Sequence, residues 1–215
     1  MLALLLPGAC GSLGGRDESA LPGGADAAAT DAPARLLVRG RIAPDTIVLE
    51  PLFMLDGAGA VATTGAARHR VRGFDSAGAI VFDETFEGTM VASGGEEHFQ
   101  LTLPTGSATA ARIQRVEVRA ADGRTARRSS ELTAGQFMDA LERTDVVTAT
   151  RTGEGAVQVR WAAGRFPAVI VRDAVSGQVL AFGRDGQTSV RTERDSLEVL
   201  VSDGVRSGSL SVRVR

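Results

Sequence analysis

The 215-residue sequence contains a single cysteine, no lysine, no asparagine and no tyrosine, and aromatic residues make up 4% of it. One thiol cannot form a disulfide within the chain, so the folded part depends on its apolar core alone. All 24 basic residues are arginines, which alternate with acidic residues and leave a formal net charge of −2. No dense basic stretch is present to neutralise a phosphate backbone, and we therefore expect no nucleic-acid partner.

The sequence also lacks the short patterns that mark common catalytic sites. It has no GxSxG, GxxxxGK[ST] or GxGxxG pattern and no spaced DxDxDG calcium loop. Acidic pairs at Asp83/Glu84 and Glu96/Glu97 are typical of solvated strand edges, although two facing carboxylates would suit a glycosidase. We expect a protein that is not an enzyme and that holds no cofactor.

The sequence has two histidines. His69 is in phase with the apolar positions of ARHRVRGF, which predicts an imidazole that faces the core and is bonded to a neighbour. His98 is out of phase with the apolar positions of EEHFQLTLP, which predicts exposure to solvent. The alternative is a metal site made of both histidines with Glu96 or Glu97. Ligand pairs with HxH or HExxH spacing are absent, so we expect no metal.

The sequence opens with a short apolar run, residues 2–6 (LALLL), far below the roughly 20 residues needed to cross a bilayer. Cys10 follows it between Ala9 and Gly11. This stretch resembles the lipobox of bacterial lipoproteins, although Pro7 stands where that family usually has leucine. The resemblance implies that the thiol of Cys10 receives diacylglycerol and that Cys10 becomes the N-terminus after cleavage, so that residues 1–10 are a signal remnant. A Sec-cleaved signal, or a fragment in which Cys10 has no role, is the alternative.

Residues 11–34 consist mainly of Gly, Ala, Asp, Ser and Pro, without apolar periodicity. Such a composition cannot bury enough apolar surface to fold and is typical of a flexible linker. Behind a lipidated cysteine it predicts a tether, with acyl chains in the membrane and a polar spacer that separates the folded part from the bilayer. The expected location is therefore an exported one, anchored by lipid in the bacterial cell envelope.

From residue 35 onward, the two-residue period of half-buried β-strands dominates. Six alternating stretches lie between residues 35 and 128, and seven more lie between residues 146 and 215, separated by turns rich in Gly, Asp and Ser. The expected fold is all-β, with two tandem antiparallel β-sandwich modules after a disordered N-terminal tether.

Residues 129–145 interrupt this pattern and predict a connector between the modules. Within them, TAGQFMDALER predicts one or two helical turns, with Thr133 as the N-cap. Phe137, Met138 and Leu141 share one side of this expected helix, and we expect them to pack into the junction between the modules.

The second module resembles the fibronectin type III and immunoglobulin-like sandwiches. The resemblance is carried by VQVRW with an inward-facing Trp161, by the pair PAVIVRD and GQVLAF, and by the terminal pair LEVLVSDGVRS and LSVRV. The tyrosine usual near the penultimate strand of the family is absent. The resemblance implies a fold that serves in adhesion, spacing, or binding of carbohydrate or protein, without indicating which.

Four arginines of this module are predicted to form an exposed face that recognises an acidic partner or a glycan: Arg160, Arg172, Arg191 and Arg213. We therefore expect a non-catalytic envelope lipoprotein that acts as a binding or scaffold module. Its expected partners are the membrane, through the lipid anchor, and an unknown envelope protein or glycan. The alternatives are an accessory domain pair associated with a secreted hydrolase, an enzyme with an unrecognised carboxylate site, and a structural spacer of the envelope.

Overall fold

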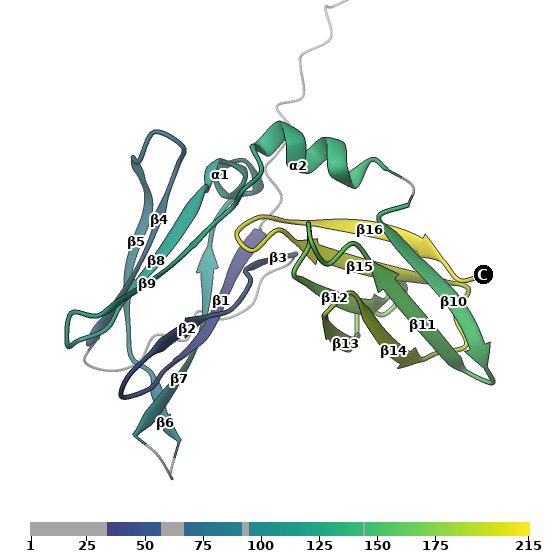
Figure 1. Cartoon of the computed structure of the whole chain (residues 1–215), viewed down its shortest axis with the longest axis horizontal. Coiled ribbons are helices and arrows are strands. Elements are labelled where there is room, and N and C mark those ends of the chain that lie inside the picture. Colours follow the sequence, from purple (N-terminus) through teal and green to yellow (C-terminus); the bar gives the residue numbers. More distant parts are fainter. Residues whose placement is uncertain (1–33, 57–66, 92–94, 144) are drawn as a thin grey trace, which may run out of the picture. The chain divides into compact units, whose positions relative to one another are not determined.

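The computed structural model describes residues 34–56, 67–91, 95–143 and 145–215, all within one compact unit, Asp31–Arg215. Cys10 and the predicted tether, except its last residue Ala34, lie outside the described residues. In the described part the fold is all-β: its strands pair antiparallel in four sheets, and two short helices accompany them (Figure 1). The predicted fold class is confirmed.

The first half of the described chain forms two sheets, A and B, which pack face to face. Sheet A has the strand order β2-β1-β7-β6, and β3 also pairs with β1. Sheet B has the order β5-β4-β8-β9. Alternate apolar residues such as Val38, Leu101 and Val118 fill the space between the two sheets. The strands are β1 (Ala34–Ile42), β2 (Ile47–Leu49), β3 (Phe53–Asp56), β4 (His69–Phe74), β5 (Ile80–Phe86), β6 (Thr89–Val91), β7 (Glu96–Pro104), β8 (Arg115–Arg119) and β9 (Thr125–Ser129).

The second half forms sheets C and D around a separate core that includes Val159, Val171 and Val199. Sheet C has the order β10-β11-β14, and sheet D has the order β13-β12-β15-β16. The first, second and fifth strands of this half thus share one sheet, and the other four share the second sheet. The strands are β10 (Val147–Gly153), β11 (Ala156–Trp161), β12 (Ala168–Asp173), β13 (Val179–Arg184), β14 (Gln187–Arg191), β15 (Ser196–Ser202) and β16 (Ser207–Arg213).

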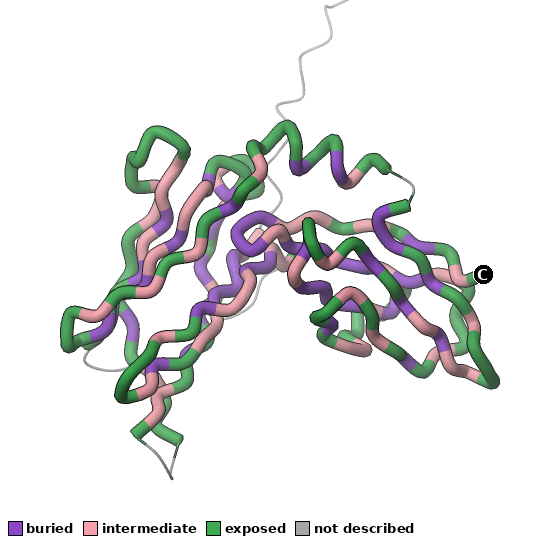
Figure 2. Tube along the Cα trace, viewed as in Figure 1, coloured by how far each residue is buried: buried purple, intermediate pink, exposed green. Residues whose placement is uncertain are grey.

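Sheets B and D have the same connectivity. Each sheet consists of two hairpins, and the first strand of one hairpin pairs with the first strand of the other. The pairing strands are β4 and β8 in sheet B, and β12 and β15 in sheet D. Buried residues alternate with more exposed ones along β4 and β8, whereas five of the six residues of β12 are buried (Figure 2). Trp161 is buried in the second core as predicted, and its indole N–H donates to the carbonyl oxygen of Phe166 at 2.9 Å.

All seven strands predicted between residues 146 and 215 are present. Where six strands were predicted between residues 35 and 128, the described residues form nine. The predicted strand over 46–55 is interrupted after Leu49 and resumes at Phe53, because Pro51 has no N–H to donate to a ladder. The short strands β6 and β9 were not predicted, and neither was the helix α1 (Ser107–Arg112).

The predicted connector helix is present as α2 (Ala134–Leu141). Thr133 caps it: its side chain accepts from the N–H of Gln136, and the Gln136 side chain accepts from the N–H of Thr133. Phe137 packs into the core of the second sandwich and Leu141 packs against it, but Met138 is exposed, so the expectation that all three pack into the junction is wrong. Neighbouring residues of a helix point about 100° apart, and α2 has one buried side only.

Candidate functional site

The two halves of the described chain meet through a small apolar cluster. Leu37 and Phe53 of sheet A pack against side chains of sheet D, on the sheet faces that point away from the two main cores. The residues contributed by sheet D are Ala168, Ile170 and Leu200. Since these outer faces carry apolar side chains, each half buries surface that it would expose alone.

Beside this cluster lies the turn SDGVRS, residues 202–207, which joins β15 to β16. Asp203 fixes the turn, because its Oδ1 accepts from the N–H groups of Val205 and Arg206 at 2.9 and 2.7 Å. Gly204 has a φ of +109°, a conformation that favours glycine. The aspartate and the glycine thus determine the shape of this turn.

Arg206 extends from this turn into the first half of the chain and is only 6% exposed. Its guanidinium donates to the Ser130 hydroxyl at 3.0 Å, to the Leu132 carbonyl at 2.7 Å and to the Ala111 carbonyl at 3.2 Å. It also donates to the side-chain oxygen of Gln114. Burial lowers the pKa of Arg206, whereas the charge of nearby Asp203 opposes that shift. All three guanidinium nitrogens have acceptors, so four of the five N–H donors of this buried cation are hydrogen-bonded.

Backbone and hydroxyl hydrogen bonds join the same turn to the segment before β3. The Ser202 hydroxyl donates to the Leu52 carbonyl at 2.6 Å, and the Leu52 N–H donates to the Gly204 carbonyl at 3.1 Å. The Met54 N–H donates to the Ser207 hydroxyl at 2.5 Å. The contact between the halves is therefore polar and specific as well as apolar.

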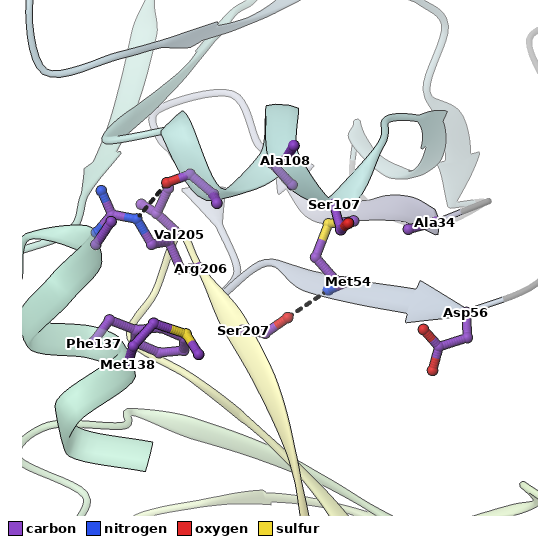
Figure 3. A pocket seen from close by; sticks show the side chains of 13 residues that line it. Ala34, Met54, Asp56, Ser107, Ala108, Phe137, Met138, Val205, Arg206 and Ser207 are labelled. Atoms are coloured by element: carbon purple, nitrogen blue, oxygen red, sulfur yellow. Dashed lines mark hydrogen bonds between the residues drawn. The ribbon is translucent and has the colours of Figure 1, made fainter. Parts of the chain in front are cut away.

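A cavity of about 430 Å³ opens next to these contacts (Figure 3). Side chains from β3, α1, α2 and the turn line it, and most of them are apolar. The apolar part comprises Met54, Phe137, Met138, Val205 and a row of alanines, Ala34, Ala108, Ala110, Ala111 and Ala134. Asp56, Ser107, Arg206 and Ser207 supply polar groups. We call this cavity the junction groove; its volume and apolar lining are typical of ligand sites.

The four arginines predicted to form one face lie on two different sheets. Arg160 and Arg191 project from sheet C, on the side away from the core. Arg172 and Arg213 belong to sheet D. Arg172 is mostly buried and is paired with Glu198 at 3.1 Å and with Asp56 at 3.7 Å. The structure does not bring these four guanidinium groups together, and binding by any of them stays a prediction.

The two histidines lie on opposite sides of β7. His69 is buried, and its Nε2 lies 2.8 Å from the Glu97 carboxylate. His98 is exposed on the other face, where it pairs with Glu96 at 2.7 Å. Both positions agree with the predicted exposure. Within the described ranges, no group of three His, Cys, Asp or Glu side chains is placed to hold a metal ion.

The surroundings of His69 determine its tautomer. Its Nδ1 accepts a hydrogen bond from the N–H of Ala121 at 3.1 Å, so the ring proton is on Nε2 and is donated to Glu97. A carboxylate beside an imidazole also occurs in catalytic sites, where the second ring nitrogen faces a nucleophile. Here that nitrogen is occupied by a backbone donor. The geometry indicates a structural role, in which His69 connects β4, β7 and the turn between β8 and β9.

No family model matches this chain, and no curated protein matches it. Among solved structures, it is similar to a chain of the CsuC–CsuE chaperone–tip adhesion subunit pre-assembly complex from archaic chaperone-usher Csu pili of Acinetobacter baumannii. The match covers 86% of this chain and 87% of that chain, with 10% sequence identity and a TM-score of 0.25. A likeness of this degree supports no conclusion about function. Neither helix of the described part is long and apolar enough to span a membrane.

Proposed function

We propose that this chain is a non-catalytic binding module of the bacterial cell envelope, anchored by lipid at Cys10, and that the junction groove is its ligand site. The observation that carries the proposal is the apolar groove beside a fully hydrogen-bonded contact between two sandwiches. Since Arg206 and the turn that carries it bond to both halves, the walls of the groove are fixed relative to one another.

The lining of the groove favours apolar side chains of a protein partner as its ligand. Met54 and Met138 are flexible and polarisable, and methionine is common where a surface accepts varied apolar groups. The alanines keep the groove open because a methyl group fills little of it. Asp56 and Arg206 are the charged groups of the lining, and each guanidinium nitrogen of Arg206 already has an acceptor within the chain. A protein segment that inserts one or two apolar side chains satisfies these requirements.

Site-specific photo-crosslinking in the host tests the groove as the binding site. A photoreactive phenylalanine analogue at Met138, which is exposed in the groove, is expected to crosslink to one discrete partner. The same analogue at Val175, an even more exposed residue in the hairpin between β12 and β13, is the control. Ala108→Trp fills the groove and is expected to abolish the Met138 crosslink, whereas Ala77→Trp, on an exposed turn outside the lining of the groove, leaves it unchanged. Equal crosslinking at both positions, or a crosslink that survives Ala108→Trp, would show that the groove is not the site.

Metabolic labelling tests the anchor. The lipobox-like stretch before Cys10 and the polar composition of residues 11–34 support this part of the proposal. Radiolabelled palmitate fed to the host is expected to enter the protein and to be lost in Cys10→Ser. Absence of label from the unaltered protein, or label that persists in the variant, would contradict lipid anchoring without bearing on the groove.

A further inference from the structure

The outer face of sheet B brings together arginines from three strands, β4 and the hairpin of β8 and β9, which begins more than 40 residues later. The pairing of β4 with β8, and of β8 with β9, places their outward-facing residues side by side. Five arginines share this face with two carboxylates, a local charge of +3 on a chain whose net charge is −2. The residues are Arg70, Arg72, Arg115, Arg119 and Arg127, with Asp83 and Glu117; we call this set the arginine face.

The two carboxylates of the arginine face lie beneath guanidinium groups. Asp83 accepts from Arg70 and Arg72, and Glu117 accepts from Arg127 at 2.6 Å. The side chains of Asp83 and Glu117 are 26% and 16% exposed, whereas those of Arg70 and Arg127 are 46% and 62% exposed. The hydrogen bond from Arg70 lowers the pKa of Asp83, which keeps this pair charged. A guanidinium has five N–H donors, so each arginine retains donors that point to solvent.

Arg119 has no acceptor among the described residues, and its neighbour in the register across the strands is Arg70. Two like charges directly opposite each other on a sheet destabilise it. Asp83 of sheet B compensates the charge of Arg70, but no described carboxylate accepts a hydrogen bond from Arg119, so part of this repulsion is left. An anion supplied from outside the chain would offset it, because it would accept hydrogen bonds from Arg119 and from the free donors of its neighbours.

From these contacts we infer that the arginine face binds a linear polysaccharide that carries carboxylates or other anionic groups. The depression between Arg70, Arg72, Glu117 and Arg119 measures only about 20 Å³, too small to enclose a free anion. Side chains on the face repeat about every 6.8 Å along a strand and about 4.8 Å across strands. An extended polymer with regularly spaced charges contacts several such positions at once.

Two other anionic partners fit the arginine face less well. Single-stranded nucleic acid binds through bases that stack on exposed aromatic rings. The aromatic ring of this face, Phe74, is covered by the Arg115 guanidinium at 4.4 Å. An acidic protein needs an apolar centre in its interface, and the centre of this face, at Arg72 and Glu117, is charged.

Calorimetric titration of the full chain with polygalacturonate, a polymer with one carboxylate per sugar, tests the inference. Binding is expected at low salt and is expected to weaken as salt rises, while neutral dextran does not bind. Arg119→Gln is expected to weaken binding about fivefold, the upper range for one exposed ion pair. Arg165→Gln, in the loop between β11 and β12, is the matched control, because it removes the same charge from another exposed arginine, and its affinity is expected to be unchanged.

Three outcomes would overturn the inference. The first is no binding of polygalacturonate at low salt. The second is an equal loss of affinity in Arg119→Gln and Arg165→Gln, which would show attraction without a defined face. The third is tighter binding of poly-glutamate or of a single-stranded DNA oligonucleotide with the same dependence on Arg119, which would assign the face to another class of partner. Failure of the groove crosslink has no bearing on any of these measurements.

Discussion

Arg206 and Gln114, 92 residues apart in the chain, are joined by a hydrogen bond from the guanidinium of one to the side-chain oxygen of the other. Arg206 belongs to the turn between β15 and β16, and Gln114 immediately precedes β8, so this bond connects the two sandwiches. The same guanidinium satisfies acceptors from Ser130 and Leu132 in the connector. One side chain thus joins three segments of the chain that are separated in the sequence.

Arg206→Met is expected to lower the free energy of unfolding by about 3 kcal/mol, because it leaves several buried acceptors without their donor and removes the ion pair with Asp203. Denaturant unfolding followed by tryptophan fluorescence and by circular dichroism measures the change. Arg160→Met, at an exposed arginine, is the control and is expected to stay within about 0.5 kcal/mol of the unaltered chain. Equal stability of the two variants would contradict the role assigned to Arg206.

The alternation of apolar and polar residues was sufficient to predict every strand of the second half, because each strand there is short and is bounded by Gly or Asp turns. It was insufficient around Pro51, where one continuous alternating stretch predicted one strand and the chain forms two, β2 and β3. The arginine face shows a different limit. The alternation in RHRVRG and RVEVR is visible in the sequence, but the pairing of β4 with β8 joins stretches more than 40 residues apart, and no local pattern contains it.

The junction groove could not be predicted from the sequence. Its lining consists of alanines, methionines and a phenylalanine, which in sequence are ordinary core residues. Arg206 gave no signal either, since an arginine in a turn is expected in solvent. A buried arginine depends on acceptors from distant segments, here Ala111, Gln114 and Ser130, whose proximity is a property of the tertiary fold.

Gly183 of β13 lies against the indole of Trp161. A Cβ at this glycine would lie 2.5 Å from Cη2 of Trp161 and 2.9 Å from Cγ2 of Val169. Gly183→Ala is therefore expected to destabilise the second sandwich by about 1–3 kcal/mol through overpacking. Thermal and denaturant unfolding measure the loss. Gly164→Ala, where the added methyl group meets no atom within 4 Å, is the control. A Gly183→Ala variant as stable as the control would show that the tryptophan adjusts freely.

His69 and His98 offer a matched comparison of a buried and an exposed imidazole. His69→Leu leaves the Glu97 carboxylate and the Ala121 N–H without this partner, and is expected to lower the free energy of unfolding by about 1–3 kcal/mol. His98→Leu removes an exposed pair with Glu96 and is expected to change it by less than about 1 kcal/mol. Addition of zinc is expected to leave the melting temperature of all three proteins unchanged. If zinc raised the melting temperature of the unaltered chain but of neither histidine variant, the two histidines would form a metal site.

The hydrogen bonds of the Asp173 carboxylate are expected to make the stability of the fold fall in acid. Its Oδ1 accepts from the N–H groups of Ser176 and Val175 at 2.8 and 3.0 Å, and its Oδ2 accepts from Arg194 at 3.0 Å. These hydrogen bonds lower the pKa of Asp173 to about 2, and the bond from the Ser176 N–H has the largest effect. An unfolded chain binds this proton near pH 3.9, so the stabilisation is complete above about pH 4 and is lost as the pH falls toward 2.

Urea midpoints measured between pH 5 and pH 2 test this dependence. The unaltered chain is expected to lose stability steadily below pH 4, and Asp173→Asn is expected to be less stable at pH 5 and to show a shallower decline. Asp195→Asn, at a carboxylate that is almost fully exposed, is the control and is expected to follow the unaltered chain. Because the side-chain amide cannot be protonated in this range, parallel curves for Asp173→Asn and the unaltered chain would mean that other carboxylates cause the decline. The hydrogen bonds of the 173–178 turn would then contribute to its shape and not to the dependence of stability on pH.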